Sequence, residues 1–404
     1  MLARIRGRLG RNTMALLVSN GGSALLSFGL SVLIGRWLGE SGLGIYASVL
    51  AWVFPLSLIT EFGLGTLITR DVASEPQQAH AYLRASVSAR LLIGGGLLAL
   101  VWWSAPLLSD NASIVQGLRL SSPLIVILPF YSSFTAIFRV RQIMQPIAYL
   151  NLSMLVGQVT LTALVLVRGG DIMSVLAVNV LTSAGQLALA WVVYRRGFYQ
   201  ATTARISLKP ILRAAMPFAV AAVLAAVQSR AVIILLEQFS TTSAVGYYAA
   251  ASRFVEAGRM LPHAFFDALF PLLAGLASTP LQLERVFRRM IAGLTLFGVL
   301  FGIGITLSAM PLITLSYGET FAPSMPVLIV LAWGLLPLLL KSGRTLYWYA
   351  QGAESFVNRI TALVLVIQIA LGIVFIPRYG VMGAAVVVVI SEIFATLLLF
   401  MRRP

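Results

Sequence analysis

The segment Ser41-Gly42-Leu43-Gly44-Ile45-Tyr46-Ala47 has a second copy in the chain, Ser243-Ala244-Val245-Gly246-Tyr247-Tyr248-Ala249. The copies lie 202 residues apart, and several other residues recur at nearly the same spacing. The further pairs are Arg11 with Arg213, Met14 with Met216, Asn151 with Asn358, and Arg195-Arg196 with Arg402-Arg403. A consistent series of this kind predicts that the chain consists of two related halves, which we place at residues 1–200 and 201–404.

The composition places both halves in a membrane. Of the 404 residues, 59% are apolar and 10% are charged, whereas a soluble domain has about 45 to 50% apolar and about 25% charged residues. A water-soluble enzyme, a disordered chain and a secreted disulfide scaffold are therefore excluded. The chain has no cysteine and two histidines, His80 and His263, so we expect no disulfide, no metal site and no cofactor.

Apolar runs separated by polar or Pro- and Gly-containing segments predict about twelve transmembrane helices. Six lie near residues 13–35, 44–66, 86–107, 119–138, 147–167 and 173–194, and six near 214–236, 244–275, 290–315, 324–345, 360–376 and 381–401. Because each half has an even number of helices, the second half enters the membrane in the same orientation as the first. We therefore predict an all-α integral membrane protein with two parallel six-helix lobes around a central cavity, an architecture in which transporters bind substrate and alternate access.

The basic residues predict the orientation in the membrane. The chain has 29 Lys and Arg residues against 13 Asp and Glu residues, a formal charge of +16. Lys and Arg favour short cytoplasmic loops. With the N-terminus inside, the inner segments hold nineteen of these cations and the outer segments hold four, so we predict that both termini are cytoplasmic. The positive charge thus reflects membrane topology, and nucleic acid is not expected as a partner.

Motifs of enzyme catalysis do not occur in the sequence. There is no Walker A sequence, no His-Glu-x-x-His, no Gly-x-Ser-x-Gly and no Asp-x-Asp, so neither ATP hydrolysis nor metal-dependent glycosyl transfer is expected. The predicted outer loops are also too short for an extracytoplasmic catalytic loop. We therefore expect a transporter rather than an enzyme, driven by an ion gradient, by the membrane potential or by removal of product.

Several segments resemble the polysaccharide exporters, the lipid-linked oligosaccharide (O-antigen type) flippases of the multidrug/oligosaccharidyl-lipid/polysaccharide (MOP) flippase superfamily. The segments that carry the likeness are Gly35-Arg36-Trp37-Leu38-Gly39, the first copy of the repeat, Glu61-Phe62-Gly63-Leu64-Gly65 with Thr69-Arg70, Pro217, Ser229-Arg230 and the second copy of the repeat. The likeness covers essentially the whole chain. The first predicted span has no Asp or Glu, unlike the drug/cation antiporters, and no cationic residue, unlike the lipid II flippases.

This resemblance implies a function, a location and a set of partners. The implied function is to move an undecaprenyl-pyrophosphate-linked oligosaccharide from the cytoplasmic to the outer leaflet of the bacterial inner membrane, for synthesis of cell-surface polysaccharide. The implied partners are this polyprenyl-pyrophosphate-linked glycan, membrane lipids, and a polymerase and glycosyltransferases of the same pathway. A cation-coupled exporter of drugs or metabolites with the same fold is one alternative, and a membrane enzyme or scaffold of glycan assembly is another.

Ionisable residues within the predicted spans are the candidate site residues. Each costs about 2.5 to 3.5 kcal/mol at the centre of a membrane helix on insertion scales, so it should face the interior of the bundle. A pyrophosphate needs cationic partners, and arginine offers planar donors for phosphate oxygens. The candidates for substrate binding are Arg230, Arg253, Arg259, Lys341 and Arg344. The candidates for ion coupling or ion pairing are Glu61, Glu256 and Asp267.

Two sets of candidates in the second half have structural alternatives. Arg253, Glu256 and Arg259 are spaced by three along one predicted helix, so Glu256 can simply neutralise the two arginines. Arg230 has no charged neighbour in sequence, so its partner must come from another helix or from substrate.

The remaining candidates have structural alternatives near the cytoplasmic surface. Lys341 and Arg344 can snorkel to that surface. The adjacent aromatic residues, Tyr347-Trp348-Tyr349, can stack on sugar rings, but we expect them in the interfacial aromatic belt. Glu61 can take up a proton, pair with Arg70, or lie exposed at the interface.

Overall fold

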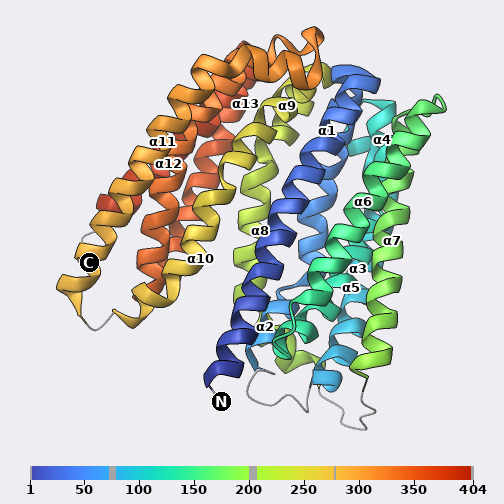
Figure 1. The fold of residues 1–404 in the computed structure, drawn as a ribbon. Helices are drawn as coiled ribbons and strands as arrows, with labels where there is room; N and C mark the ends of the chain where they lie inside the picture. Colours follow the sequence, from blue (N-terminus) through green and yellow to red (C-terminus); the bar gives the residue numbers. More distant parts are fainter. Residues whose placement is uncertain (1, 72–78, 200–206, 277–278, 402–404) are drawn as a thin grey trace. The chain divides into compact units, whose positions relative to one another are not determined.

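The computed structural model describes residues 2–71, 79–199, 207–276 and 279–401. Throughout these residues the regular structure is helical, with no strand, which confirms the predicted all-α class. The helices of the first half are α1 (Leu2–Glu61), α2 (Leu64–Asp71), α3 (Ala79–Leu108), α4 (Ala112–Ser121), α5 (Leu124–Val140), α6 (Gln145–Val167) and α7 (Ile172–Gly197) (Figure 1). Those of the second half are α8 (Leu208–Phe239), α9 (Thr242–Gly258), α10 (Met260–Gly275), α11 (Pro280–Tyr317), the short 3-10 helix η2 (Glu319–Phe321), α12 (Ser324–Ala350) and α13 (Glu354–Met401).

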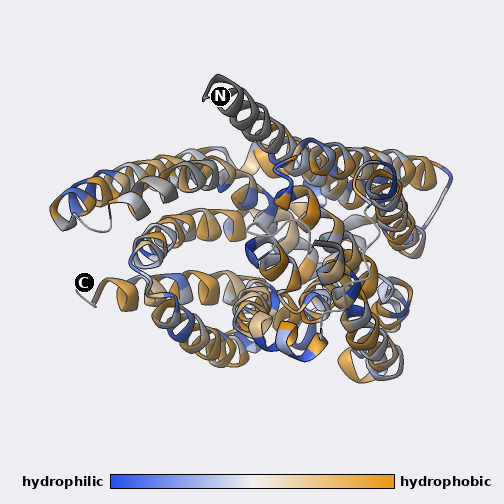
Figure 2. Cartoon of the chain, turned by 90° about the horizontal axis from the view of Figure 1, so that it is seen from below, coloured by the Kyte–Doolittle hydropathy of each residue, from blue (hydrophilic) through white to orange (hydrophobic). Residues whose placement is uncertain are grey.

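The protein is a multi-pass membrane protein. In the part of the chain that the structure describes, nine helical segments are long and apolar enough to cross a bilayer, and hydrophobic residues predominate along the helices (Figure 2). Two segments far exceed the ~20 residues that one crossing needs: Val18–Asp71 has 54 residues and Glu354–Met401 has 48. The predicted number of about twelve spans stays a prediction.

A glycine interrupts the helical conformation inside each of these two long segments. Gly39 has φ 69° and Gly380 has φ 55°, a left-handed conformation that glycine adopts without the steric cost of a Cβ. Both glycines coincide with the connections that the sequence predicts, between spans 13–35 and 44–66 and between spans 360–376 and 381–401. The chain therefore changes direction where the sequence predicts a break.

The predicted helix 244–275 is interrupted near its middle. Helix α9 ends at Gly258 and α10 begins at Met260, with Arg259 between them. Pro262 has no N–H to donate to the carbonyl of Gly258, four residues earlier, which breaks the regular hydrogen-bond pattern. The prediction of one continuous helix is therefore wrong, and Arg259 occupies the break.

Polar side chains define where several helices begin. Asn111 Oδ1 accepts a hydrogen bond from the N–H of Ser113 at 2.9 Å at the start of α4. Asp171 Oδ1 accepts one from the N–H of Ser174 at 3.0 Å at the start of α7. Thr241 does the same at the start of α9. Such caps satisfy N–H groups that have no partner within the helix. They therefore mark where α4, α7 and α9 begin after the connections that precede them.

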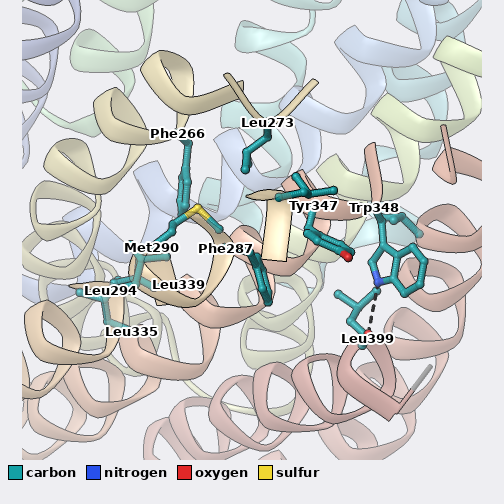
Figure 3. Packing of buried hydrophobic residues seen from close by; sticks show 12 residues of the cluster. Phe266, Leu273, Phe287, Met290, Leu294, Leu335, Leu339, Tyr347, Trp348 and Leu399 are labelled. Carbon is teal, nitrogen blue, oxygen red and sulfur yellow. Dashed lines mark hydrogen bonds between the residues drawn. The ribbon is translucent and has the colours of Figure 1, made fainter. Parts of the chain in front are cut away.

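The helices form two compact units. The first comprises Met1–Leu30 and Val49–Ala226, and the second comprises Ser31–Ser48 and Val227–Pro404. One apolar cluster of the second unit packs residues of α10, α11, α12 and α13, including Phe287, Met290 and Leu339 (Figure 3). In the first unit, Phe138 and Tyr194 belong to a cluster made by α3, α5, α6 and α7. The predicted division into residues 1–200 and 201–404 stays a prediction.

Candidate functional site

Charged side chains from α8 and α9 gather in the second unit. Arg253 Nη1 donates a hydrogen bond to Oε2 of Glu256, one turn further along α9, at 2.9 Å. Arg230 of α8 is attracted by the charge of Glu256 and repelled by that of Arg253. Arg230 lies nine residues before the end of α8, about 14 Å at 1.5 Å per residue. The charges of Arg230, Arg253 and Glu256 thus act on one another across α8 and α9, and we call these three residues the α8–α9 cluster.

Buried tyrosines lie beside this cluster. Tyr248 interacts electrostatically with Arg230, and Tyr46 and Tyr317 interact with Arg253. All three tyrosines are buried, and the Tyr317 hydroxyl shares a hydrogen bond of 3.0 Å with the Ser31 hydroxyl. The cluster thus combines guanidinium donors with phenolic hydroxyls, which both donate and accept hydrogen bonds.

Arg259 lies at the C-terminal end of α9. The carbonyl groups at such an end carry partial negative charge, which favours a cation. The Nε of Arg259 is buried, and no hydrogen-bond acceptor for it occurs among the described residues. The side chain of Asp267, in α10, lies outside the described part of the chain, so the role expected for Asp267 stays a prediction.

Lys341 and Glu392 form an ion pair between α12 and α13. Lys341 Nζ lies 2.8 Å from Oε1 and 2.6 Å from Oε2 of Glu392. Each residue lies nine positions before the end of its helix, about 14 Å at 1.5 Å per residue. Lys341 therefore does not snorkel to the cytoplasmic surface but meets a carboxylate inside the span. The only sequence sign of this pair was the isolated acid Glu392 in the last predicted span.

Aromatic rings enclose Arg344, which is 6% exposed. The guanidinium carbon lies 4.8 to 5.2 Å from the centroids of four rings, those of Tyr347, Trp348, Phe400 and Phe287. A guanidinium within about 6 Å of a ring centroid gains a cation–π interaction, which is stronger when the group is desolvated. Arg344 is thus held by protein groups, and the snorkelling alternative is wrong for it.

A carbonyl group of α13 completes the surroundings of Arg344. The Nε of Arg344 and the Nε1 of Trp348 both donate to the carbonyl oxygen of Leu399, each at 3.2 Å, and Figure 3 shows the bond from Trp348. Tyr347 is 3% exposed and Trp348 is 4% exposed. The expectation that these two rings belong to the interfacial aromatic belt is therefore wrong, because they pack inside the protein.

Glu61 pairs with Arg90 in the first unit, and not with Arg70. Arg90 Nη2 lies 3.4 Å from Glu61 Oε1, and the Arg90 side chain is fully buried. The same oxygen accepts hydrogen bonds from the N–H of Gly65 at 2.9 Å and from the hydroxyl of Ser132 at 3.1 Å. Arg70 instead contacts its neighbour Asp71 at 2.7 Å. Of the roles considered for Glu61, the structure shows the ion pair, and with a different partner from the one expected.

The Glu61–Arg90 pair connects several helices of the first unit. Glu61 ends α1, Arg90 lies on α3, and Ser132 and Ser133 lie on α5. Arg90 Nη1 also donates a hydrogen bond to the Ser133 hydroxyl. Arg90 lies within the predicted span 86–107, but the sequence does not reveal this network, because neither the Ser132-Ser133 pair nor the spacing of the charges distinguishes it from ordinary membrane helices.

The comparisons with known proteins place the chain in a family. Residues 9–277, well over half of the chain, match the family described as polysaccharide biosynthesis protein. The chain belongs to this polysaccharide biosynthesis protein family. The resemblance on which the sequence analysis relied is thereby confirmed.

Among curated proteins, this family member is similar to the "Probable flippase AglR" of Haloferax volcanii. The two are 29% identical over 177 residues, which are 42% of this chain and 37% of that relative. The match thus spans little more than a third of the relative's length.

Solved structures show the fold. A lipid II flippase, MurJ, in an inward closed conformation aligns with a TM-score of 0.79 and 17% identity, over 95% of this chain and 86% of that chain. An inward-facing multidrug resistance MATE family transporter of the MOP superfamily aligns with a TM-score of 0.79 and 14% identity, over 96% of each chain. A MOP superfamily transporter from Pyrococcus furiosus, described as having a binding pocket of reverse polarity, aligns with a TM-score of 0.69 and 14% identity, over 98% of this chain and 94% of that chain. The protein therefore has the MOP transporter fold.

Proposed function

We propose that this protein is a flippase for an oligosaccharide linked to undecaprenyl pyrophosphate, which it moves from the cytoplasmic to the outer leaflet of a bacterial inner membrane by alternating access. Both termini lie in the cytoplasm in this proposal. Membership of the polysaccharide biosynthesis protein family supports a glycan as part of the cargo. The similarity to a probable flippase supports movement of that cargo between the two leaflets.

The observation that carries the proposal is the excess of positive charge between α8 and α9. Arg230 and Arg253 lie within electrostatic reach of one acid, Glu256, and the buried Nε of Arg259, at the end of α9, has no acceptor among the described residues. An unbalanced cation is costly inside a membrane, so an anionic ligand that neutralises the cluster gains binding energy from it. A pyrophosphate carries negative charge on several oxygens, and guanidinium groups bind such oxygens with paired hydrogen bonds.

The neighbouring hydroxyl groups fit the sugar part of the same cargo. Tyr248 and Tyr317 lie within electrostatic reach of the arginines, and a phenolic hydroxyl both donates to and accepts from sugar hydroxyls. Aromatic rings also pack on the apolar faces of sugars. We assign the arginines to the pyrophosphate and the tyrosines to the first sugar residue.

The charge of the cluster disfavours the alternative of an exporter of cationic drugs. A cationic substrate would be repelled by Arg230 and Arg253, whose two positive charges exceed the one negative charge of Glu256. The similarity to MATE transporters concerns the fold alone, since the identity to the inward-facing MATE structure is 14%. An anionic lipid-linked cargo is therefore the better chemical match to the α8–α9 cluster.

The deciding experiment is a leaflet-exchange assay on the full chain reconstituted in liposomes. The probe is a fluorescent polyprenyl-pyrophosphate disaccharide, and wild type is compared with Arg230→Glu. We expect wild-type exchange, and a fall of about tenfold or more in the variant, which corresponds to about 1.4 kcal/mol or more of lost interaction.

Arg168→Gln is the matched control. Arg168 is an exposed arginine at the end of α6, so its loss should leave the exchange rate within about twofold of wild type. Absence of exchange by folded wild-type protein, with a pH gradient and a membrane potential applied, would overturn the proposed function. Exchange by Arg230→Glu at the wild-type rate would overturn the assignment of the site.

A further inference from the structure

Three arginines lie on one exposed face near the start of α11. Arg285, Arg288 and Arg289 are all exposed. Residues three and four positions apart are neighbours on a helix surface, so the three guanidinium groups extend to the same side. Glu284 compensates one of these charges, because its carboxylate lies 2.9 Å from the Nε of Arg288. Among the described residues, no acid forms an ion pair with Arg285 or Arg289.

The opposite face of the same turns is packed inside the second unit. Leu283, Phe287 and Met290 are buried in the apolar cluster of α10, α11, α12 and α13 (Figure 3). The ring centroid of Phe287 also lies 5.2 Å from the guanidinium carbon of Arg344. This packing fixes the rotation of α11 about its axis. The side to which Arg285 and Arg289 extend is therefore determined by the core.

The exposed face of α11 continues beyond the arginines without a further charge. No Asp, Glu, Lys or Arg occurs in residues 290–317. Steps of three and four residues from Arg289 lead along the same face to Leu296, Leu300, Ile303 and Leu307, whose exposed fractions are 45% to 81%. On a helix that spans a bilayer, apolar side chains exposed in this way contact acyl chains. The face thus combines cations at one end with an apolar surface along the rest.

The length of α11 places the arginines at the membrane surface. The helix has 38 residues, about 57 Å at 1.5 Å per residue, whereas the hydrocarbon core is about 30 Å thick. The uncharged residues 290–317 extend about 42 Å, close to the thickness of the core together with its two headgroup regions. Arg285 and Arg289 directly precede this stretch, so their guanidinium groups lie at the level of the lipid headgroups.

An anionic phospholipid matches this face in charge and in polarity. Arg285 and Arg289 are one turn apart, about 5 to 6 Å between Cβ atoms, so both guanidinium groups can bind the oxygens of one phosphate. The acyl chains of the same molecule then lie along the apolar part of the face. A zwitterionic headgroup carries its own cation, which the arginines repel. An acidic soluble protein can contact the arginines but not the apolar residues within the bilayer.

We propose that Arg285 and Arg289, together with the apolar face of α11 that follows them, form a binding site for an anionic phospholipid of the surrounding membrane. In the proposed orientation this site faces the cytoplasmic leaflet, whose anionic lipids attract basic residues near the surface. None of its residues belongs to the α8–α9 cluster, so the site is separate from the one proposed for the cargo. The bound lipid holds the first turns of α11 at the membrane surface and stabilises the packing of Phe287 behind them.

The test titrates the full chain in neutral detergent micelles with phosphatidylglycerol, or with phosphatidylcholine of the same acyl chains, and detects bound lipid by native mass spectrometry. Wild type is compared with Arg285→Gln/Arg289→Gln and with Arg195→Gln/Arg196→Gln. The second variant removes two exposed arginines from the end of α7. It changes the net charge equally, but adjacent residues do not share a helix face. We expect phosphatidylglycerol to bind the α11 variant about 25-fold more weakly, about fivefold for each arginine, and to bind the α7 variant as it binds wild type.

A second measurement is hydrogen exchange in nanodiscs of phosphatidylcholine, with or without phosphatidylglycerol. Phosphatidylglycerol should slow exchange in the first turns of α11 in wild type and in the α7 variant, but not in the α11 variant. Equal binding of phosphatidylglycerol by all three proteins, or an equal loss in both variants, would overturn the site. Displacement of bound phosphatidylglycerol by an equimolar polyprenyl-pyrophosphate disaccharide would assign the arginines to the cargo and overturn the phospholipid assignment. Neither measurement involves transport, so the outcome is independent of the proposed function.

Discussion

The hydroxyl oxygens of Ser41 and Ser243 lie 2.9 Å apart in the second unit, although the two serines are 202 residues apart in sequence. They occupy the same position in the two copies of the repeat. A contact between equivalent residues is the mark of a local two-fold relationship, in which residue i meets j and j meets i. The repeat found in the sequence is therefore also present as a contact in the folded chain.

Two glycines show the same reciprocity. A Cβ on Gly44 would strike the backbone carbonyl of Thr242, and a Cβ on Gly246 would strike the backbone carbonyl of Glu40. Glu40 and Thr242 are again 202 residues apart. The two segments thus approach backbone to backbone, as small residues permit in membrane helices.

The cysteine-free chain allows a direct test of the serine contact. In the double variant Ser41→Cys/Ser243→Cys we expect a disulfide to form on mild oxidation, because the two Oγ atoms lie 2.9 Å apart and a small side-chain rotation brings two sulfur atoms from there to the ~2.05 Å of an S–S bond. The measurement is the change of electrophoretic mobility, followed by the leaflet-exchange rate before and after reduction. If alternating access separates these segments, the cross-link stops exchange and a reductant restores it.

Single variants control for the cross-link. Ser41→Cys alone and Ser243→Cys alone leave one thiol each, so neither forms an intramolecular disulfide. An oxidised double variant that retains the mobility and free-thiol content of the reduced protein would show that the two serines do not meet in the membrane.

The glycine contact predicts a steric effect on stability. Gly44→Ala places a methyl group against the carbonyl of Thr242, and overpacking of this kind costs about 1 to 3 kcal/mol. Gly157→Ala is the control, because a Cβ at Gly157 meets no atom within 4 Å. The apparent melting temperature in detergent should fall for Gly44→Ala and stay level or rise for Gly157→Ala. Equal melting temperatures for the two variants would contradict the close approach.

Local sequence patterns predicted much of the helical architecture. Apolar runs and their Gly or Pro interruptions predicted the helices and the breaks near Gly39 and Gly380, because both depend on residues adjacent in sequence. The sequence patterns did not predict the interruption at Arg259, although Pro262 lies three residues after it. Proline is tolerated in membrane helices, so its presence alone does not distinguish a kink from a complete break.

The pairing of charges was much harder to predict. Sequence alone placed Arg230, Glu61 and Lys341 within predicted spans and made them candidates for the bundle interior, since lipid penalises a charge that faces it. Their partners lie on other helices, at separations of 26, 29 and 51 residues, and depend on how the helices rotate and pack. The enclosure of Arg344 was missed for the same reason, because two of its rings come from α11 and α13.

The Glu61–Arg90 pair predicts an asymmetric response to mutation. Glu61→Gln leaves the fully buried Arg90 guanidinium without a counterion, which costs about 3 to 5 kcal/mol. The double variant Glu61→Gln/Arg90→Met removes both charges and should recover most of the lost stability. The measurement is thermal unfolding in detergent for the single and double variants. A double variant less stable than the single one would indicate that Arg90 contributes mainly through its bonds to other groups.

The aromatic surroundings of Arg344 predict that lysine cannot replace it. Arg344→Lys keeps the charge but loses the planar group between the rings and the Nε bond to the Leu399 carbonyl, an expected cost of about 1 to 2 kcal/mol. Because Leu399 lies near the end of α13, hydrogen exchange at the last turn of that helix should accelerate while exchange in α6 stays unchanged. Arg288→Lys is the control, because the Arg288 side chain is 78% exposed. Equal protection of the end of α13 in the two variants would mean that the rings hold any cation equally well.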